Sequence, residues 1–243
     1  MSANGERVLK NYWISTCSWR VRMVLAYKGL DYKYEAINLH KSEDDDPEYV
    51  KMNPSGVPTL IEPDGRVFTQ SMAIMEYLEE KYPENSIMPK EAGDRALCRA
   101  LALEIISGLQ PLQNMGVAHL FKLCKPYWPA EKKNIQIGAK QVGPMGEVTN
   151  IKYLRDIITE KLWGFENLLS RTAGTHCFGD SFTIADAALM PQANACRSSF
   201  GLDLSIFPTI SRVLANIEKL DCVQKTHPDV CPDAVKPVAK PAA

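Results

Sequence analysis

The first eighty residues alternate between extended and helical spacing of their hydrophobic positions. A mixed apolar segment over residues 8–14 is followed by Val21, Val24 and Leu25 at helical spacing, which predicts a strand leading into a helix. Residues 32–38 then alternate apolar and polar side chains in the manner of a second strand. The pattern therefore predicts a βαβ unit at the start of the chain.

A second group of elements follows a short acidic connection. Residues 57–61 form an apolar extended segment, Pro63-Asp64-Gly65 predicts a tight turn into a partner strand, and residues 71–81 have the periodicity of an amphipathic helix. The order βαβ followed by ββα, with Pro58 opening the third strand, predicts a thioredoxin-like α/β domain, which we place at residues 6–84. Proline lacks an amide donor for the sheet, so we also hypothesise a cis bond before Pro58 at a strand edge.

Helical periodicity dominates the rest of the chain after a linker rich in helix-breaking residues. We therefore expect an all-α domain at residues 90–228. Prolines and glycines interrupt the pattern between residues 126 and 150, which predicts an irregular excursion. The segment Thr183-Ile184-Ala185-Asp186 matches a capping box and is assigned to folding. Residues 229–243 contain several prolines and few large apolar side chains, so we expect a disordered tail.

Charge and cysteine usage exclude several classes of function. The 243 residues include 28 basic and 29 acidic side chains without a long basic run, so a nucleic-acid partner is not expected. No stretch approaches the length of a membrane span, and residues 1–7 lack the pattern of a signal peptide. The scattered cysteines and histidines predict neither disulfides nor a metal site, and we expect a cytoplasmic protein with reduced thiols. The cysteines are Cys17, Cys98, Cys124, Cys177, Cys196, Cys222 and Cys231.

The segment Ser15-Thr16-Cys17 carries the first candidate chemistry because it lies where a strand is predicted to give way to a helix. The free amides and the dipole of a helix N-terminus stabilise a thiolate or another anion there. The simpler interpretation is an N-cap, worth about 1 kcal/mol. Cys17 is an alternative nucleophile, since the first turn of a helix lowers the pKa of a thiol. It has no neighbouring cysteine, which disfavours dithiol chemistry.

Three other positions are weaker candidates for binding an anion or a peptide. Gln70-Ser71 precedes a predicted helix, so its side chains and amides form a possible carboxylate site. Val57 precedes Pro58 and has a main chain able to pair with an extended ligand. Arg197 follows an apolar helical stretch, where a buried cation requires an anionic partner.

The segment Ser15-Thr16-Cys17-Ser18-Trp19-Arg20-Val21-Arg22 resembles the Ser-Ser-Cys-Ser-Trp-Arg-Val-Arg signature of the zeta-class glutathione transferases, which are also maleylacetoacetate isomerases. The resemblance covers nearly the whole chain except about 121–156 and the tail. It includes Asn53-Pro54, Val57-Pro58-Thr59-Leu60, Gln70-Ser71, Gln110-Pro111-Leu112-Gln113-Asn114, Ala185-Asp186, Arg197 and Pro208-Thr209-Ile210. It implies a thioredoxin-like glutathione domain, a helical substrate domain and a homodimer.

The resemblance also implies a role for each matching residue. Ser15 would hydrogen-bond the sulfur of glutathione, with Thr16 and Cys17 as its catalytic neighbours. Val57 would pair its backbone with the cysteinyl unit, and Arg197 would hold a substrate carboxylate. Further residues implied in glutathione binding are Ser18, Trp19, Arg20, Gln70, Ser71, Gln110 and Asn114. Thr16 departs from the family's usual serine by one methyl group.

The implied activity is the glutathione-dependent cis–trans isomerisation of maleylacetoacetate to fumarylacetoacetate, in tyrosine and phenylalanine catabolism, with conjugation of small α-halo acids as a second reaction. Two alternatives remain open at this point. One is a non-catalytic binding or assembly module with the same fold, motivated by the irregular stretch around Gly143 and by Met115-Gly116, where the family has other residues. The other is a monothiol or dehydroascorbate-type reductase that uses Cys17.

Overall fold

A mixed four-stranded sheet organises the N-terminal half of the chain. The computed structural model describes residues 5–113 and 150–235 together with two short strands at 135–137 and 140–142. The strand order is β2-β1-β3-β4, with β1 parallel to β2 and antiparallel to β3. The strands are β1 (Val8–Asn11), β2 (Lys33–Ala36), β3 (Thr59–Ile61) and β4 (Val67–Thr69). This topology confirms the predicted βαβ and ββα units. The first three strands are shorter than the segments predicted for them at residues 8–14, 32–38 and 57–61.

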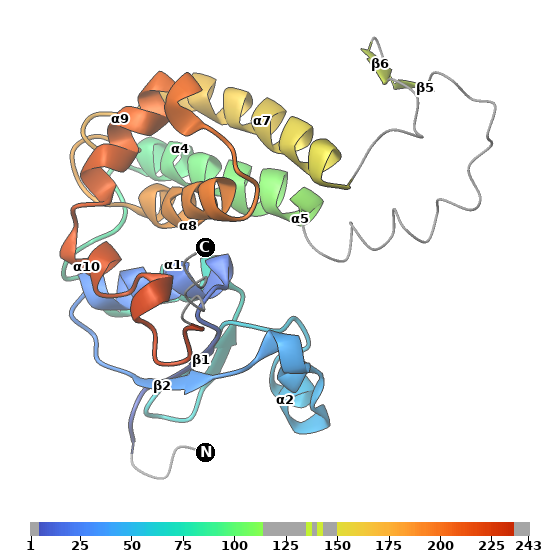
Figure 1. The fold of residues 1–243 in the computed structure, drawn as a ribbon. Coiled ribbons are helices and arrows are strands. Elements are labelled where there is room, and N and C mark those ends of the chain that lie inside the picture. The colour runs from blue at the N-terminus through green and yellow to red at the C-terminus, as the bar shows by residue number, and fades with distance from the viewer. Residues whose placement is uncertain (1–4, 114–134, 138–139, 143–149, 236–243) are drawn as a thin grey trace, which may run out of the picture.

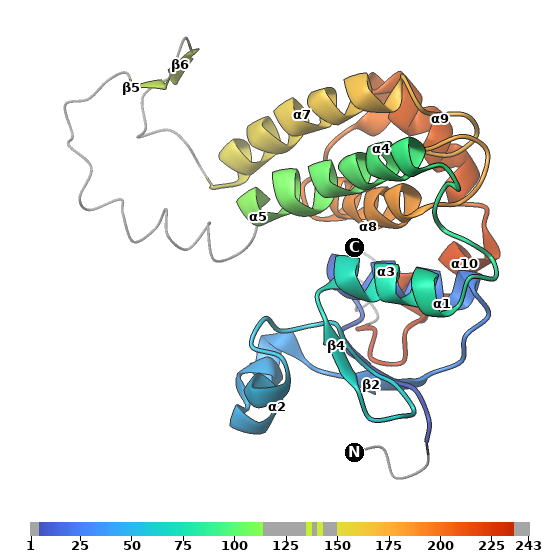
Figure 2. The same ribbon diagram turned by 180° about the vertical axis from the view of Figure 1, so that it is seen from behind.

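Helices α1 (Thr16–Tyr27) and α3 (Ser71–Lys81) lie between this sheet and the helical domain (Figure 2). Helix α2 (Pro47–Met52) lies away from the helical domain and was not predicted, because its six residues are too few for a recognisable period. Asp46 defines its start by accepting hydrogen bonds from the amides of Glu48 and Tyr49. Pro47 follows at the first helical position, where its missing donor costs nothing.

The second domain is built from helices that pack on one another above α1 (Figure 1). This arrangement confirms the predicted fold class. The helices are α4 (Ala92–Leu103), a π-helical turn at Glu104–Leu109, α5 (Gln110–Gln113), α7 (Asn150–Leu169), α8 (Ile184–Ser198), α9 (Pro208–Ile217) and α10 (Asp221–Gln224). The predicted irregular excursion contains an antiparallel pair, β5 (Ile135–Ile137) and β6 (Lys140–Val142). Within the described ranges no helix has both the length and the apolar character needed to cross a membrane.

The capping box predicted at the start of α8 is present. The amide of Thr183 donates to the Asp186 carboxylate at 2.8 Å, and so does its hydroxyl. The second carboxylate oxygen of Asp186 accepts the amide of Cys177 at 2.8 Å. A fully buried aspartate is therefore satisfied by three donors, and the box also ties α8 to the preceding loop.

One continuous apolar core joins the two domains. Helix α1 packs against α8, with Val24 and Leu25 of α1 in the same buried cluster as Ala185 and Leu189 of α8. Each large buried side chain contributes about 1.5–3 kcal/mol by leaving water. Because this core runs through both domains, the start of α1 keeps a constant position relative to α5 and α8.

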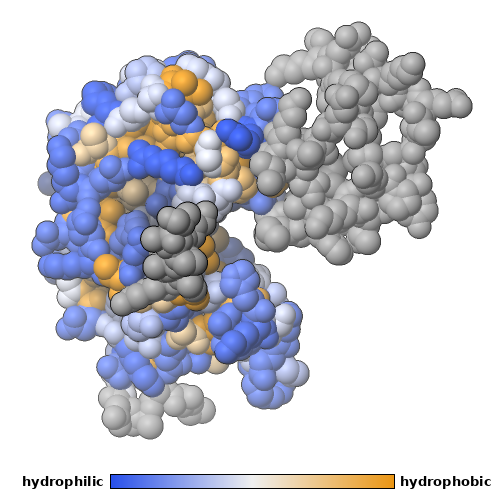
Figure 3. Space-filling view, in the orientation of Figure 1, coloured by the Kyte–Doolittle hydropathy of each residue, from blue (hydrophilic) through white to orange (hydrophobic). Residues whose placement is uncertain are grey.

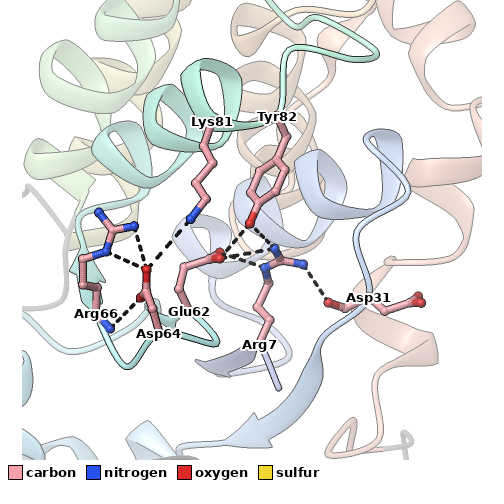
Figure 4. A network of polar contacts seen from close by, with 7 residues as sticks. All are labelled: Arg7, Asp31, Glu62, Asp64, Arg66, Lys81 and Tyr82. Atoms are coloured by element: carbon pink, nitrogen blue, oxygen red, sulfur yellow. Dashed lines mark hydrogen bonds and ion pairs between the residues drawn. The ribbon is translucent and has the colours of Figure 1, made fainter. Parts of the chain in front are cut away.

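Two polar networks link the N-terminal elements to one another. In Figure 4 the Arg7 guanidinium contacts Glu62 at 2.8 Å and the Tyr82 hydroxyl at 2.7 Å, which connects β1, the end of β3 and the end of α3. At the second network the ammonium of Lys28 contacts Glu79 at 2.9 Å and donates to main-chain carbonyls of the linker. Lys28 and Glu79 are both buried, so each requires the other.

The segment after α10 differs from the tail expected from its composition. It turns back over the N-terminal domain, where residues 228–230 form a short 3₁₀ helix (Figure 1). The Asp233 carboxylate accepts hydrogen bonds from the Trp13 amide at 3.1 Å and the Tyr34 hydroxyl at 2.5 Å. These partners are about two hundred residues away in the sequence, so local composition gave no indication of them. Residues 236–243 of the predicted tail lie outside the described part.

Candidate functional site

Ser15 ends the turn between β1 and α1 and is the N-cap of the helix. Its amide donates to the Tyr12 carbonyl at 3.1 Å, and its hydroxyl oxygen accepts the Ser18 amide at 3.2 Å. The side-chain oxygen is thus an acceptor for the helix, which leaves the hydroxyl proton available as a donor. The interpretation as an N-cap is correct, and it does not compete with a role in binding.

Ser15 lines a cavity of about 850 Å³ that lies between the two domains. Figure 3 shows the surface indented between the helical domain and the N-terminal domain, with polar side chains over much of the outer surface. The N-terminal domain lines the cavity with Ile14, Ser15, Thr16, Cys17, Trp19, Arg20, Leu39, Asn53, Ser55, Val57, Pro58, Gln70 and Ser71. The helical domain contributes Ile106, Gln110, Pro111, Gln113, Leu154, Pro191, Asn194, Ala195 and Ser198, with Ser199 and Phe200 after α8.

Arg20 is the only charged residue among the described residues that line this cavity. Its side chain is 1% exposed, and one guanidinium nitrogen donates to the Ser71 hydroxyl at 2.8 Å and contacts the Cys17 sulfur at 3.7 Å. Its Nε atom is buried and has no partner, and no carboxylate pairs with it within the described ranges. Burial lowers the pKa of Arg20, whereas the neighbouring Cys17 sulfur favours the charged form. An uncompensated guanidinium attracts an anion to this end of the cavity.

An amide network connects the start of α1 to the helical domain. A π-helical turn precedes α5, and π turns are frequent at functional sites. The Gln110 amide nitrogen donates to the Thr16 hydroxyl at 3.2 Å and to the Gln192 side-chain oxygen at 3.2 Å. The Gln110 oxygen accepts from Arg20. The network therefore fixes which end of the Gln110 amide faces the guanidinium.

Sequence reasoning did not identify Gln192. This residue is fully buried on α8, and its side chain exchanges two hydrogen bonds with Gln113, at 3.0 and 2.9 Å. A signal was present, since Gln192 is a polar residue directly after the apolar run at 187–191. A buried amide in such a run requires partners, which predicts a polar network nearby.

Val57, Gln70 and Ser71 meet at the same cavity although they come from separate segments. The Val57–Pro58 bond is cis, as hypothesised, and neither main-chain polar group of Val57 has a partner among the described residues. Gln70 has φ 66° and ψ 113°, a conformation that is rare for residues other than glycine. Such strain is concentrated at binding sites, where a ligand interaction offsets it. Ser71 is the first residue of α3 and lines the cavity, so the helix end that carries unpaired amides lies at this site.

Other predicted site residues lie elsewhere or outside the description. Ser18 is buried, and its hydroxyl accepts the Tyr12 amide at 3.4 Å. The indole nitrogen of Trp19 donates to Thr226 at 3.0 Å, although Trp19 also borders the cavity. Arg197 does not line the cavity: it is exposed at the end of α8 and forms an ion pair with Glu218, the residue that follows α9. A buried arginine was expected there, but Arg197 lies on the exposed side of the last turn of α8, whereas its neighbour Cys196 is buried. Asn114 lies outside the described residues.

The described residues contain no cluster of three or more histidine, cysteine or acidic side chains able to hold a metal ion. The cavity instead combines a hydroxyl donor at a helix start, an uncompensated guanidinium and an unpaired stretch of main chain. Donors of this kind bind carboxylate groups, a thiolate and the peptide units of an extended ligand.

Comparison with known proteins agrees with this geometry. Residues 14–81 match the family described as glutathione S-transferase, N-terminal domain. Over 236 residues the chain is 39% identical to the maleylacetoacetate isomerase of Dictyostelium discoideum, covering 94% of this chain and 98% of that protein. It is 36% identical to a zeta-class glutathione S-transferase of Euphorbia esula, covering 95% and 94% of the two chains.

A solved structure shares both the fold and the sequence pattern. It is a maleylacetoacetate isomerase from Anaeromyxobacter dehalogenans 2CP-1 with dicarboxyethyl glutathione and citrate bound in its active site. The TM-score is 0.78 at 37% identity, with 95% of this chain and 98% of that chain covered. The chain therefore belongs to the zeta-class glutathione transferases, the family that includes the maleylacetoacetate isomerases.

Proposed function

We propose that this protein is a glutathione-dependent cis–trans isomerase that converts maleylacetoacetate to fumarylacetoacetate. The observation that carries the proposal is the Ser15 hydroxyl, which caps α1 with its oxygen, keeps a proton free to donate, and lines the same cavity as Arg20. Similarity to maleylacetoacetate isomerases over nearly the full chain supports the same conclusion. Glutathione would supply a thiolate nucleophile when bound.

The residues of the N-terminal domain fit glutathione in both shape and chemistry. Glutathione is a peptide with two carboxylates, and the free main-chain groups of Val57 provide one extended edge for it. Gln70 and Ser71 would hold the γ-glutamyl carboxylate, since both line the cavity at the N-terminus of α3, where the first amides have no partner within the helix. These assignments use main-chain groups and neutral side chains, which with Arg20 make up the N-terminal side of the cavity.

Ser15 and Arg20 would lower the pKa of the bound thiol. A hydroxyl donor, the positive end of α1 and a guanidinium that pairs with no carboxylate in the described part of the chain each favour the anionic form of sulfur. Gln110 of the helical domain holds this group of donors in place through its hydrogen bonds with Thr16 and Arg20 of α1. The Arg20 guanidinium, whose Nε has no partner among the described residues, would also stabilise an oxygen that gains negative charge during isomerisation.

The helical domain would hold the second substrate. Its lining residues are apolar or neutral, with Asn194 and Ser198 as hydrogen-bonding groups on α8. Arg197, one residue before Ser198, would hold a substrate carboxylate only after leaving Glu218, with which it is paired here. We further propose that the same thiolate-stabilising donors support displacement of halide from small α-halo acids.

The decisive assay measures isomerisation of maleylacetone, a stable analogue of the substrate, by the purified protein with and without reduced glutathione. We expect conversion only with glutathione. No conversion would exclude the isomerase. Retention of the protein on immobilised glutathione, without turnover of maleyl or halo-acid substrates, would favour a non-catalytic binding module instead.

We also propose a homodimer and a cytoplasmic location. Val67 on β4 and Leu97 and Leu103 on α4 are exposed apolar side chains, each more than 40% accessible, and a second copy of the chain would cover them. Light scattering would measure the mass in solution, and Leu97→Glu should shift it to that of the monomer.

The described cysteines are all unpaired, which suits a reducing compartment and supports the cytoplasmic location. Imaging of a tagged full-length chain would test the location.

A further inference from the structure

Two side chains hold the turn that precedes Ser15, because one bonds the amide and the other the carbonyl of Trp13. The Trp13 amide donates to Asp233 Oδ2 at 3.1 Å, and the Trp13 carbonyl accepts from Arg22 Nη2 at 2.9 Å. Arg22 also donates to the Tyr12 carbonyl at 3.2 Å. That carbonyl accepts the Ser15 amide at 3.1 Å. Arg22 and the Ser15 amide therefore share the Tyr12 carbonyl as their acceptor. Ser15 lies two residues after Trp13, which Asp233 and Arg22 both contact.

The Arg22 half of this arrangement belongs to the buried interior. Its guanidinium is 1% exposed and donates to Asn11 Oδ1 at 2.9 Å and the Thr226 carbonyl at 3.3 Å. The Thr226 hydroxyl accepts the Trp19 indole nitrogen at 3.0 Å, and His227 packs edge-on against the same indole with ring centroids 5.1 Å apart. The C-terminal segment is therefore anchored on the back of α1 before it reaches Asp233.

The Asp233 half is supplied entirely by the C-terminal segment. One carboxylate oxygen accepts the Trp13 amide, and the other accepts the Tyr34 hydroxyl on β2 at 2.5 Å. Burial and this hydrogen bond raise the pKa of Tyr34 well above its usual range, so the phenol remains the donor. Asp233 therefore bridges strand β2 and the turn before Ser15. Without it, the Trp13 amide has no acceptor among the described residues.

We propose that Asp233 is a positioning residue for the isomerase reaction: it holds the Trp13 peptide against β2 and thereby directs the Ser15 hydroxyl toward the sulfur of bound glutathione. The inference rests on the proposed function. Hydrogen-bond strength falls steeply with misalignment, and a displacement of about 1 Å costs roughly 100-fold in rate at a catalytic group. Loss of the Asp233 hydrogen bond alone should reduce the rate by less than this, because Arg22 still bonds the Trp13 carbonyl.

The test compares Asp233→Ala with a matched control, Asp229→Ala. Asp229 lies four residues earlier in the same segment, its side chain is 79% exposed, and it contacts His227 rather than the turn. Hydrogen–deuterium exchange measures protection of the Trp13 amide directly. The pH dependence of kcat/KM and the ultraviolet absorbance of the bound thiolate measure whether the Ser15 hydroxyl still acts on sulfur.

For Asp233→Ala we expect at least tenfold faster exchange at Trp13 and a rise of about one unit in the apparent pKa of the bound thiol. This shift corresponds to about tenfold lower kcat/KM below that pKa and a smaller loss above it. Asp229→Ala should match wild type in each measurement. Asp233→Asn keeps one oxygen as an acceptor for Trp13, so it should restore most of the protection and of the activity.

Each contrary result contradicts a separate step. Unchanged exchange at Trp13 in Asp233→Ala would show that Asp233 does not hold the turn. Faster exchange with a wild-type pH profile would overturn the link to Ser15, because a purely structural contact would change stability without moving the thiol pKa. Failure of the wild-type protein to bind glutathione would overturn the proposed function, while the exchange measurement would still decide whether Asp233 holds the turn.

Discussion

Replacement of Ser15 separates two roles that the structure assigns to one side chain. Ser15→Ala removes the N-cap acceptor of the Ser18 amide and also the hydroxyl donor that faces the cavity. Loss of an N-cap to alanine costs about 1 kcal/mol of folding free energy, whereas loss to glycine costs only roughly 0.3 kcal/mol. Ser15→Gly should therefore be nearly as stable as wild type while lacking the donor.

The expected loss of activity follows from the charge on the acceptor. A hydrogen bond to a charged group contributes about 1.5–3 kcal/mol, which corresponds to a 10- to 100-fold decrease in kcat/KM near neutral pH and a rise of about one to two units in the apparent pKa of bound glutathione. Ser15→Ala and Ser15→Gly should lose activity equally, although they differ in stability. Ser15→Thr keeps the hydroxyl and should retain most of the turnover.

The assay is maleylacetone isomerisation across a range of pH, with urea unfolding of each variant measured in parallel. Ser18→Ala is the matched control, because Ser18 lies three residues away, is fully buried, and accepts only the long 3.4 Å bond from Tyr12. Equal loss of turnover in Ser15→Gly and Ser18→Ala would refute the role of Ser15 as thiol donor. A loss that followed unfolding free energy across the series would refute it as well.

Three further predictions concern the interior. Lys28→Met leaves Glu79 buried without its cation and should lower the free energy of urea unfolding by about 3–5 kcal/mol, whereas Lys51→Met, at an exposed ion pair, should change it by less than about 1 kcal/mol. Gln192→Leu removes the acceptor that the side-chain nitrogens of Gln110 and Gln113 share, so stability should fall by about 1–3 kcal/mol. Gln110 keeps its bonds with Thr16 and Arg20 but loses its link to α8, so the KM for glutathione should rise, and an unchanged KM would contradict the network's role. Finally, burial raises the pKa of three thiols from 9.0 to about 11, namely those of Cys98, Cys196 and Cys222. The unfolded chain loses these protons at lower pH than the folded chain, so the free energy of urea unfolding should be retained below pH 9 and should fall toward pH 11. A free energy of unfolding that did not fall over this range would contradict the burial of these thiols.

Patterns confined to a few neighbouring residues were sufficient to predict most of the architecture. The apolar periodicities predicted the βαβ and ββα units, and the Thr183–Asp186 spacing predicted the cap of α8. The strand-to-helix junction at Ser15 was also recognised, because an N-cap depends only on the residues of one turn. The short helix α2 was missed, since six residues are too few for a periodic signal.

The site itself depends on contacts that no local pattern contains. Arg20, Gln110 and Gln192 come from three helices, and only packing of the two domains brings them together. The same applies to Arg197, which local sequence placed at an anion site but which the end of α8 directs to Glu218.

The sequence by itself determined the two-domain order, the helix start at Ser15 and the resemblance to a glutathione-dependent family. Only the tertiary structure decided that Arg20 has no carboxylate partner among the described residues and that Asp233 reaches the Trp13 amide. The physical reason is the range of the interactions. Caps and periodicities are satisfied within one turn or strand, whereas a buried charge or amide finds its partner wherever the whole chain places one.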